Sequence, residues 1–433
     1  MGRAADMIPQ SAARAMMSMA SSGSMRAQIG ALIIATSFIQ LANGFFGTFI
    51  SLRVATENFG ATLAGLVLSS YFAGFTLGAV RCGQIIERVG HIRAYAAFAG
   101  LVVAATAAMP LLIGPLPWFV LRAMVGFGCA GVFVTTESWL NAKAQPSERG
   151  RVFSLYMVGT FLALAVGQLL ISRIEVKGAA PFNVIVNLFA VALVMVSMTR
   201  AEPPLTVATE KLPYGQLSRA APVAVIGCAM SGLVSSAFYA LVPAWMQDEG
   251  IQRENIALFM LVAVVGGLAL QAPVGRLSDR YNRLLVLAAL GFGFAGAAVA
   301  LVHLPRFPSV LVPTAALLGG FMSTLYPVCV ADAHDRMPAN RVVAVSGRLI
   351  LVSGLASILG PLIGTSIMAR SGIDGLFYFM AAAALILALV AAAGGLATAA
   401  PRHLRRPFEI LAPQAASLAH NQLDSSNVAF SQD

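Results

Sequence analysis

Long apolar segments, separated by short polar turns, repeat along almost the whole chain. A helix needs about 20 apolar residues to cross the roughly 30 Å hydrocarbon core of a bilayer. Segments of that length cover residues 28–52, 61–82, 92–114, 117–141, 152–173, 181–200, 221–246, 254–276, 283–303, 308–331, 342–369 and 373–398. The pattern therefore predicts an all-α membrane protein with twelve transmembrane helices and a lipid bilayer as its surroundings.

A charged turn between the second and third spans has a shortened counterpart later in the chain. Residues 83–93 read GQIIERVGHIR and residues 275–283 read GRLSDRYNR, and their first glycine, their acid and the arginine after the acid are each 192 residues apart. The segments 146–149 (PSER) and 338–341 (PANR) repeat at the same offset. Two landmarks at one offset predict a duplication into two six-helix halves.

The landmarks and the spans divide the chain into five segments. The two halves cover residues 26–200 and 220–400, and a polar linker that contains prolines joins them at 201–219. Residues 1–25 lack the apolar core of a signal peptide, and residues 401–433 are polar. Both terminal segments are predicted to be disordered tails.

Composition and charge support a membrane location. The chain is 58% apolar and 11% charged, whereas soluble proteins carry about 25% charged residues. Of the 28 Lys and Arg residues, 20 fall in regions that an internal N-terminus places inside, and 6 fall in outer loops. Because cytoplasmic loops of membrane proteins are enriched in Lys and Arg, both termini are predicted to be cytoplasmic, and the net charge of +10 does not require a nucleic-acid partner. The four cysteines lie in or beside apolar segments, which predicts no disulfide framework.

Two motifs connect this pattern to a known family. The turn after the second span fits the signature Gly-x-x-x-Asp-Arg-x-Gly-x-x-Arg through Gly83, Glu87, Arg88, Gly90 and Arg93, with Glu in place of Asp. The second copy keeps Gly275, Asp279, Arg280 and Arg283 but lacks the inner glycine, and the fourth span contains Arg122-x-x-x-Gly126-x-Gly128. With twelve spans in two halves, the chain resembles the major facilitator superfamily of secondary transporters, and the resemblance implies that family's fold.

One departure concerns the type of transporter. Drug/proton antiporters of this superfamily carry a Gly-Pro-rich motif in the fifth span, whereas residues 159–168 contain no proline. A Gly-Pro pair occurs instead in the eleventh span, at residues 360–361. The run ESWLN at residues 137–141 is similar to a branch known mostly as predicted transporters. The departure weakens the assignment to drug efflux without excluding it.

Polar residues inside the spans are the candidates for a substrate cavity, because charge inside a bilayer is costly. Arg122 either faces a central cavity, where it would bind an anionic substrate group or a coupling carboxylate, or extends to the outer membrane surface. The family pattern favours the cavity. The uncharged candidates are Gln40, Asn43, Tyr156, Thr160, Ser235 and Tyr239. Hydrogen bonding between helices is the competing explanation for each of them.

Glu137 is an acidic residue within the predicted fourth span. It is interpreted either as a proton carrier, since burial favours the protonated form of a carboxyl group, or as a latch that pairs with Arg88 or Arg93. The latch is favoured, because Glu137 lies about one turn from the cytoplasmic end of its span. Arg348, in the eleventh span, is expected to meet Glu87 or Glu137.

The family's arrangement implies that the signature turns act as a gate. Glu87 would face the start of the eleventh span, and Asp279, which precedes Arg280, would face the start of the fifth span near Arg149 and Arg151. These contacts would form only while the cytoplasmic side is closed.

The chain contains neither a glycine-rich phosphate loop nor a nucleophile–base pair, so neither an enzyme nor a cofactor is predicted. Asp332, His334 and Asp335 are interpreted as a solvated helix end rather than a metal site. The predicted function is secondary transport of a small molecule by alternating access, coupled to protons, by a monomer in the cell inner (plasma) membrane. Efflux of a drug-like compound and uptake of a small anion both remain open. The rival from another class is a transport-inactive receptor or assembly partner.

Overall fold

The computed structural model describes residues 10–145, 148–198, 214–338 and 341–397. Within this part of the chain, twelve helices are long and apolar enough to cross a membrane. The predicted all-α architecture with twelve membrane-spanning helices is therefore confirmed.

The helices follow the predicted spans closely. Those of the first half are α1 (Gln10–Thr56), α2 (Ala61–Val89), α3 (His91–Ala108), α4 (Pro115–Lys143), α5 (Arg149–Leu169), which the 3₁₀ turn η1 (Leu170–Ser172) extends, and α6 (Ala180–Ser197). Those of the second half are α8 (Pro222–Asp248), α9 (Arg253–Arg280), α10 (Arg283–His303), α11 (Pro308–Arg336), α12 (Val342–Ser371) and α13 (Gly375–Ala397).

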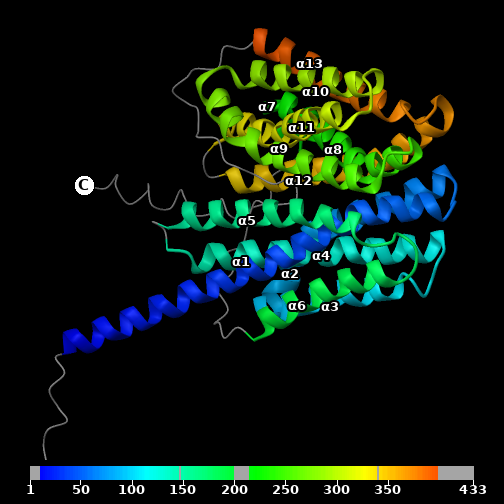
Figure 1. Ribbon diagram of the computed structural model, residues 1–433. Coiled ribbons are helices and arrows are strands. Elements are labelled where there is room, and N and C mark those ends of the chain that lie inside the picture. The colour runs from blue at the N-terminus through cyan, green and yellow to red at the C-terminus, as the bar shows by residue number, and fades with distance from the viewer. Residues whose placement is uncertain (1–9, 146–147, 199–213, 339–340, 398–433) are drawn as a thin grey trace, which may run out of the picture.

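The two halves repeat one packing scheme. In the first, α2 packs on α4, α1 on α5 and α3 on α6; in the second, α9 packs on α11, α8 on α12 and α10 on α13. The two bundles lie one above the other in Figure 1. They meet mainly through α2 with α12, α5 with α9 and α1 with α8. Each pair of packed helices in the first half corresponds, at the 192-residue offset, to a packed pair in the second half, as the predicted duplication requires.

Equivalent glycines bring helices into close contact in both halves. A Cβ atom on Gly74 of α2 would collide with the carbonyl oxygen of Ala123 on α4. A Cβ atom on Gly266 of α9, 192 residues later, would collide with the carbonyl oxygen of Ala316 on α11. Small residues let helix backbones approach closely where lipid supplies no hydrophobic drive for association.

Two segments differ from the predicted boundaries. The first helix begins at Gln10 and projects well beyond the bundle in Figure 1, so residues 10–25 continue the helix where a disordered tail was predicted. This stretch is rich in Ala and Met, which are strong helix formers. Part of the predicted linker forms the short helix α7 (Tyr214–Ala220). Residues 401–433 lie outside the described part of the chain.

Most of the predicted turn at 83–93 is helical. Only Gly90 separates α2 from α3, and its φ of 82° with ψ of 162° is a backbone conformation that is essentially restricted to glycine. We call the end of the bundle with residues 83–93 and 275–283 the signature end, and the opposite end, with residues 57–60 and 372–374, the far end.

Candidate substrate cavity

A cavity lies between the two halves. Residues of α1, α2, α4 and α5 line it from one side, and residues of α8, α11 and α12 line it from the other. Its volume is about 150 Å³. A cavity of about that volume can hold a benzene ring, so this cavity has room for a small organic solute.

Five of the predicted cavity residues line this space, and two do not. Gln40, Asn43, Arg122, Ser235 and Tyr239 are part of its wall. Asn43 donates a hydrogen bond to Gln40 Oε1 (3.3 Å) and accepts one from Cys129 Sγ (3.5 Å).

Tyr156 and Thr160 lie outside the lining. Tyr156 Oη donates to Glu137 Oε1 (3.4 Å), and Thr160 Oγ1 donates to the carbonyl oxygen of Tyr156 (2.8 Å). Gln168 of the same helix does line the cavity, where it accepts a hydrogen bond from Thr48 (2.5 Å). Successive residues of a helix are about 100° apart, so Tyr156 and Gln168, twelve positions apart, point in different directions.

Residues of α2 and α12 that were not predicted from the sequence also line the wall. Tyr71, Phe72, Phe75 and Thr76 of α2 line the cavity, as do Ser353 and Ser357 of α12. The aromatic residues of α2 are typical of any apolar span, so they carried no signal. The two serines, four positions apart, share one face of α12, and that spacing was the available signal.

Arg122 lies within the cavity wall rather than at the membrane surface. It is 6% exposed, and its Cζ lies 4.9 Å from the ring centroid of Phe46 on α1 and 4.8 Å from that of Tyr71 on α2. Its Nε is buried and has no hydrogen-bond partner among the described residues. A cation over aromatic faces is stabilised by the ring quadrupoles. The geometry therefore does not support extension of the side chain to the membrane surface.

Glu137 is buried nearer the signature end of α4. It is 1% exposed and accepts the hydrogen bond of Tyr156. Arg88 and Arg93, its predicted partners, are exposed and make no hydrogen bond or ion pair within the described residues. The predicted latch between these arginines and Glu137 is thus not formed in this structure.

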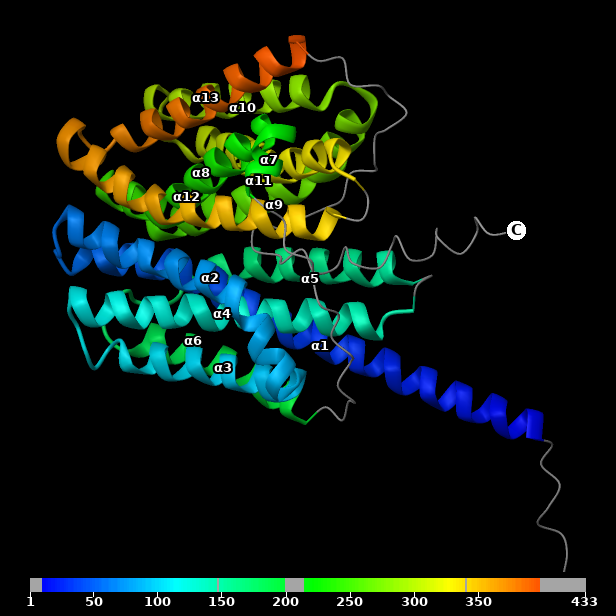
Figure 2. The ribbon, with the colours of Figure 1, turned by 180° about the vertical axis from the view of Figure 1, so that it is seen from behind.

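The halves are in tight contact near the far end. A Cβ atom on Gly65 of α2 would collide with Thr365 Oγ1 of α12. Halfway along the same two helices, a Cβ atom on Gly354 of α12 would collide with Thr76 Oγ1 of α2. On the other side, Phe161 and Ala165 of α5 form an apolar cluster with residues of α9. From this end, α2 and α12 diverge towards the signature end (Figure 2). α2 and α12 are therefore in contact from the far end to about their middle, and they lie farther apart at the signature end.

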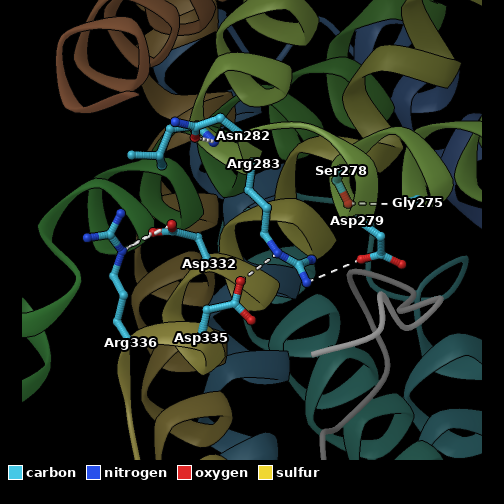
Figure 3. A network of polar contacts seen from close by, with 9 residues as sticks. Gly275, Ser278, Asp279, Asn282, Arg283, Asp332, Asp335 and Arg336 are labelled. Atoms are coloured by element: carbon cyan, nitrogen blue, oxygen red, sulfur yellow. Dashed lines mark hydrogen bonds and ion pairs between the residues drawn. The ribbon is translucent and has the colours of Figure 1, made fainter. Parts of the chain in front are cut away.

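The second signature turn is held within its own half (Figure 3). Arg283 is 3% exposed, and it binds Asp335 of α11 through Nε (2.7 Å) and Asp279 of α9 through a terminal nitrogen (3.2 Å). Asp279 was predicted to face the start of α5, but its carboxylate is bound by an arginine four residues away. Arg280 is exposed and lies over the ring of Tyr281, 5.9 Å from its centroid.

The signature end of α11 is also more ordered than predicted. Asp332 and His334 are 5% and 6% exposed. Arg336 Nε donates to both carboxylate oxygens of Asp332 (3.0 Å each), and His334 Nε2 lies 2.7 Å from Ser346 Oγ of α12. These residues form a network of polar contacts rather than the solvated helix end that was predicted. Arg348, the predicted partner of Glu87 or Glu137, is half-buried on α12.

Comparison with known families decides the assignment. The family model described as Major Facilitator Superfamily matches residues 32–305 and again residues 224–423. The chain belongs to the major facilitator superfamily. The resemblance inferred from the two signature turns and from Arg122 is confirmed.

Curated members of the superfamily match most of this chain. An uncharacterized MFS-type transporter of Enterobacter sp. (strain 638) is 30% identical over 362 residues, which cover 83% of this chain and 94% of the relative. The uncharacterized MFS-type transporter YcaD of Escherichia coli O6:K15:H31 is 29% identical over 357 residues, 81% of this chain and 91% of the relative.

Solved superfamily structures share the fold at low sequence identity. A bacterial homologue of the human lysosomal transporter Spinster, in an inward-facing and unoccupied conformation, superposes with a TM-score of 0.70 at 15% identity, covering 88% of this chain and 98% of the other. The nucleoside transporter NupG gives 0.72 at 12% identity, with 85% and 99% coverage.

Membership of the superfamily defines the general role of the molecule. It is a multi-pass membrane protein of a transporter family, and transmembrane transport of a small molecule is the activity that its relatives and its fold support.

Proposed function

We propose that this superfamily member is a secondary active transporter that moves a small solute by alternating access and couples the movement to protons. The observation that carries the proposal is the central cavity, which both halves line and beside which α2 and α12 are in close contact from the far end to about their middle. Rocking of two repeat-related bundles about a site between them is the usual basis of alternating access.

Orientation follows from the distribution of Lys and Arg. Their excess in the regions at the signature end favours a cytoplasmic location for that end and for both termini. The arrangement described above is then inward-facing. We place the protein in the cell inner membrane, where it acts as a monomer, since each half supplies one wall of the cavity.

Closure of the cytoplasmic side requires the halves to meet at the signature end. Glu87 lies at the end of α2, on the exposed surface, and the start of α12 carries Arg341 and Arg348. The positive end of a helix dipole and nearby arginines stabilise a carboxylate. Glu87 is therefore proposed to latch α2 to α12 in the outward-facing state.

Glu137 is the proposed proton carrier. Its carboxyl group is buried beside the Tyr156 hydroxyl, and it lies 15 residues from Arg122 on the same helix. That separation is about 22 Å along the axis, which rules out direct pairing with the Arg122 side chain along one helix. Glu137 and Arg122 therefore have separate roles, in proton coupling and in the cavity.

The test is counterflow and uptake in proteoliposomes with a metabolite panel, with and without a pH gradient. Glu137→Gln is expected to keep counterflow and to lose accumulation driven by the gradient, because an amide cannot carry the proton. Glu254→Gln, an exposed acid in the first turn of α9, is the matched control and should behave as the native protein. Native accumulation by Glu137→Gln at every pH would remove that residue as the carrier. Silence of the native protein against a broad panel would favour the receptor interpretation.

A further inference from the structure

We propose that the central cavity selects a small organic monoanion, a carboxylate joined to an apolar body of about the size of one aromatic ring. The inference deepens the proposed transport function and rests on it for its physiological meaning, but binding alone can test it.

The cavity wall carries an uncompensated positive charge. Among its lining residues, Arg122 is the one charged residue, and the wall contains no carboxylate. A cation in a site of low dielectric constant, without a neighbouring acid, attracts an anion and repels a cation. The interpretation of Arg122 as the partner of a coupling carboxylate in the cavity loses its support. Cationic drug-like substrates are disfavoured for the same reason.

Aromatic rings hold the Arg122 guanidinium in the wall. Phe46 and Tyr71 stabilise the guanidinium through ring contacts at 4.9 and 4.8 Å, and Nε is buried without a hydrogen-bond partner among the described residues. Contacts with ring faces do not use N–H donors as hydrogen bonds do, so donors remain available. A guanidinium presents donors in a fixed fork that matches a carboxylate. A single cation suits one negative charge, whereas a dianion would keep one charge uncompensated.

Further aromatic side chains line the cavity. The first half also contributes Phe72, Phe75 and Phe161 to the cavity wall, and the second half contributes Tyr239. Offset and edge contacts between aromatic rings favour a flat apolar ligand beyond the area that they bury. The ring of the substrate is therefore expected to lie among these side chains.

The wall that the second half contributes carries several hydroxyl groups. Ser323 of α11 and Ser235, Ser353 and Ser357 of the neighbouring helices line the cavity. Ser357 Oγ donates to the carbonyl oxygens of Gly232 (3.0 Å) and Ser353 (2.8 Å), and Ser235 Oγ donates to that of Gly232 (3.3 Å). Their oxygens keep acceptor capacity for a donor on the substrate. A ring substituent that carries a hydroxyl or amide group would suit this wall.

The test is titration calorimetry on the native protein in detergent with matched probes: benzoate, its neutral isostere benzamide, benzylammonium and inorganic phosphate. Benzoate is expected to bind at least tenfold more tightly than any of the other three. Equal affinity for benzoate and benzamide, or tighter binding of benzylammonium or phosphate, would overturn the inference, and this comparison needs no variant.

Variants then assign the effect to Arg122. Arg122→Gln is expected to abolish the preference for benzoate over benzamide, and Arg122→Lys to retain part of it, because Lys keeps the charge but not the fork. Arg370→Gln, on the exposed last turn of α12, is the control for loss of one positive charge and should keep the preference. Retention of the full preference by Arg122→Gln would overturn the assignment.

Transport assays separate this inference from the proposed function. Counterflow of benzylammonium but not of benzoate would support the proposed transport function and contradict the proposal that the cavity selects a monoanion. Selective binding of benzoate without counterflow of any solute would sustain the anion site and overturn transport.

Discussion

The two signature turns arise from one duplicated sequence, yet the structure uses them differently. In the second half, Arg283 binds Asp279 and Asp335 and holds the turn to α11. In the first half, Glu87 is exposed and forms no ion pair within the described residues. The positions equivalent to Arg283 and Asp335 are His91 and Lys143, 192 residues earlier, so the same bridge is not available. Among the described residues of the two turns, Glu87 is a carboxylate that no cation of its own half binds, whereas Asp279 is bound by Arg283.

The backbones of the two turns differ in the same way. The first turn depends on Gly90, with its φ of 82°, while the second uses Asn282, whose side-chain oxygen caps α10 by accepting from Leu284 N (3.0 Å). The second turn therefore does not need the inner glycine of the family signature. A duplicated motif thus keeps its place in the fold of each half. The residues around it decide whether its carboxylate binds within its own half or is available to the other half.

Removal of the Arg283 side chain should have the largest effect on stability, because this residue anchors the second turn. Arg283→Ala leaves two carboxylates without their cation, and breaking such a buried network is expected to lower the free energy of unfolding by about 3 kcal/mol. Arg88→Ala, in the exposed first turn, should change it by less than about 0.5 kcal/mol. Unfolding titrations in mixed detergent micelles measure both. Equal losses for the two variants would show that the turns are equally anchored.

Substitutions at Gly90 and Asn282, which shape the backbones of the two turns, should have the next largest effect on the free energy of unfolding. Gly90→Ala forces a side chain into a conformation restricted to glycine and is expected to cost about 2 kcal/mol. Asn282→Ala loses a helix cap and should cost about 1 kcal/mol, whereas Asn282→Gly should cost only a few tenths. The same unfolding titrations compare the three variants. A cost of Asn282→Gly as large as that of Gly90→Ala would contradict the proposed difference.

The smallest expected effect is on the conformational equilibrium. Glu87→Ala removes the proposed latch of the outward-facing state, which as an exposed ion pair is worth a shift of about twofold. The shift is measured as faster maleimide labelling of Ser235→Cys, in a background without the native cysteines, from the signature side of inside-out vesicles.

Asp279→Ala is the matched control for the labelling assay. Its carboxylate is bound to Arg283 within its own half, so labelling should remain unchanged. If Asp279→Ala accelerated labelling as much as Glu87→Ala, the two turns would be equivalent gates after all.

Prediction from sequence succeeded where the signal is local or periodic. The spans follow from runs of apolar residues, and the duplication follows from one offset. Five of seven predicted cavity residues line the cavity, because polar side chains are excluded from lipid and turn inward. Tyr156 and Thr160 do not line the cavity, because a buried polar side chain can also form its hydrogen bond within the protein. Tyr156 bonds to Glu137 of the neighbouring α4, and Thr160 bonds to the backbone of α5.

The sequence by itself determined twelve spans, two related halves, membership of the family and Arg122 as an intramembrane charge. Only the tertiary structure decided which charges meet. Arg283 and Asp335 are 52 residues apart, and Arg122 meets Phe46 and Tyr71 from two other helices. Whether a segment enters the bilayer depends on the hydropathy of that segment alone. Contacts between helices depend on how the segments rotate and pack against one another, and no local pattern specifies that.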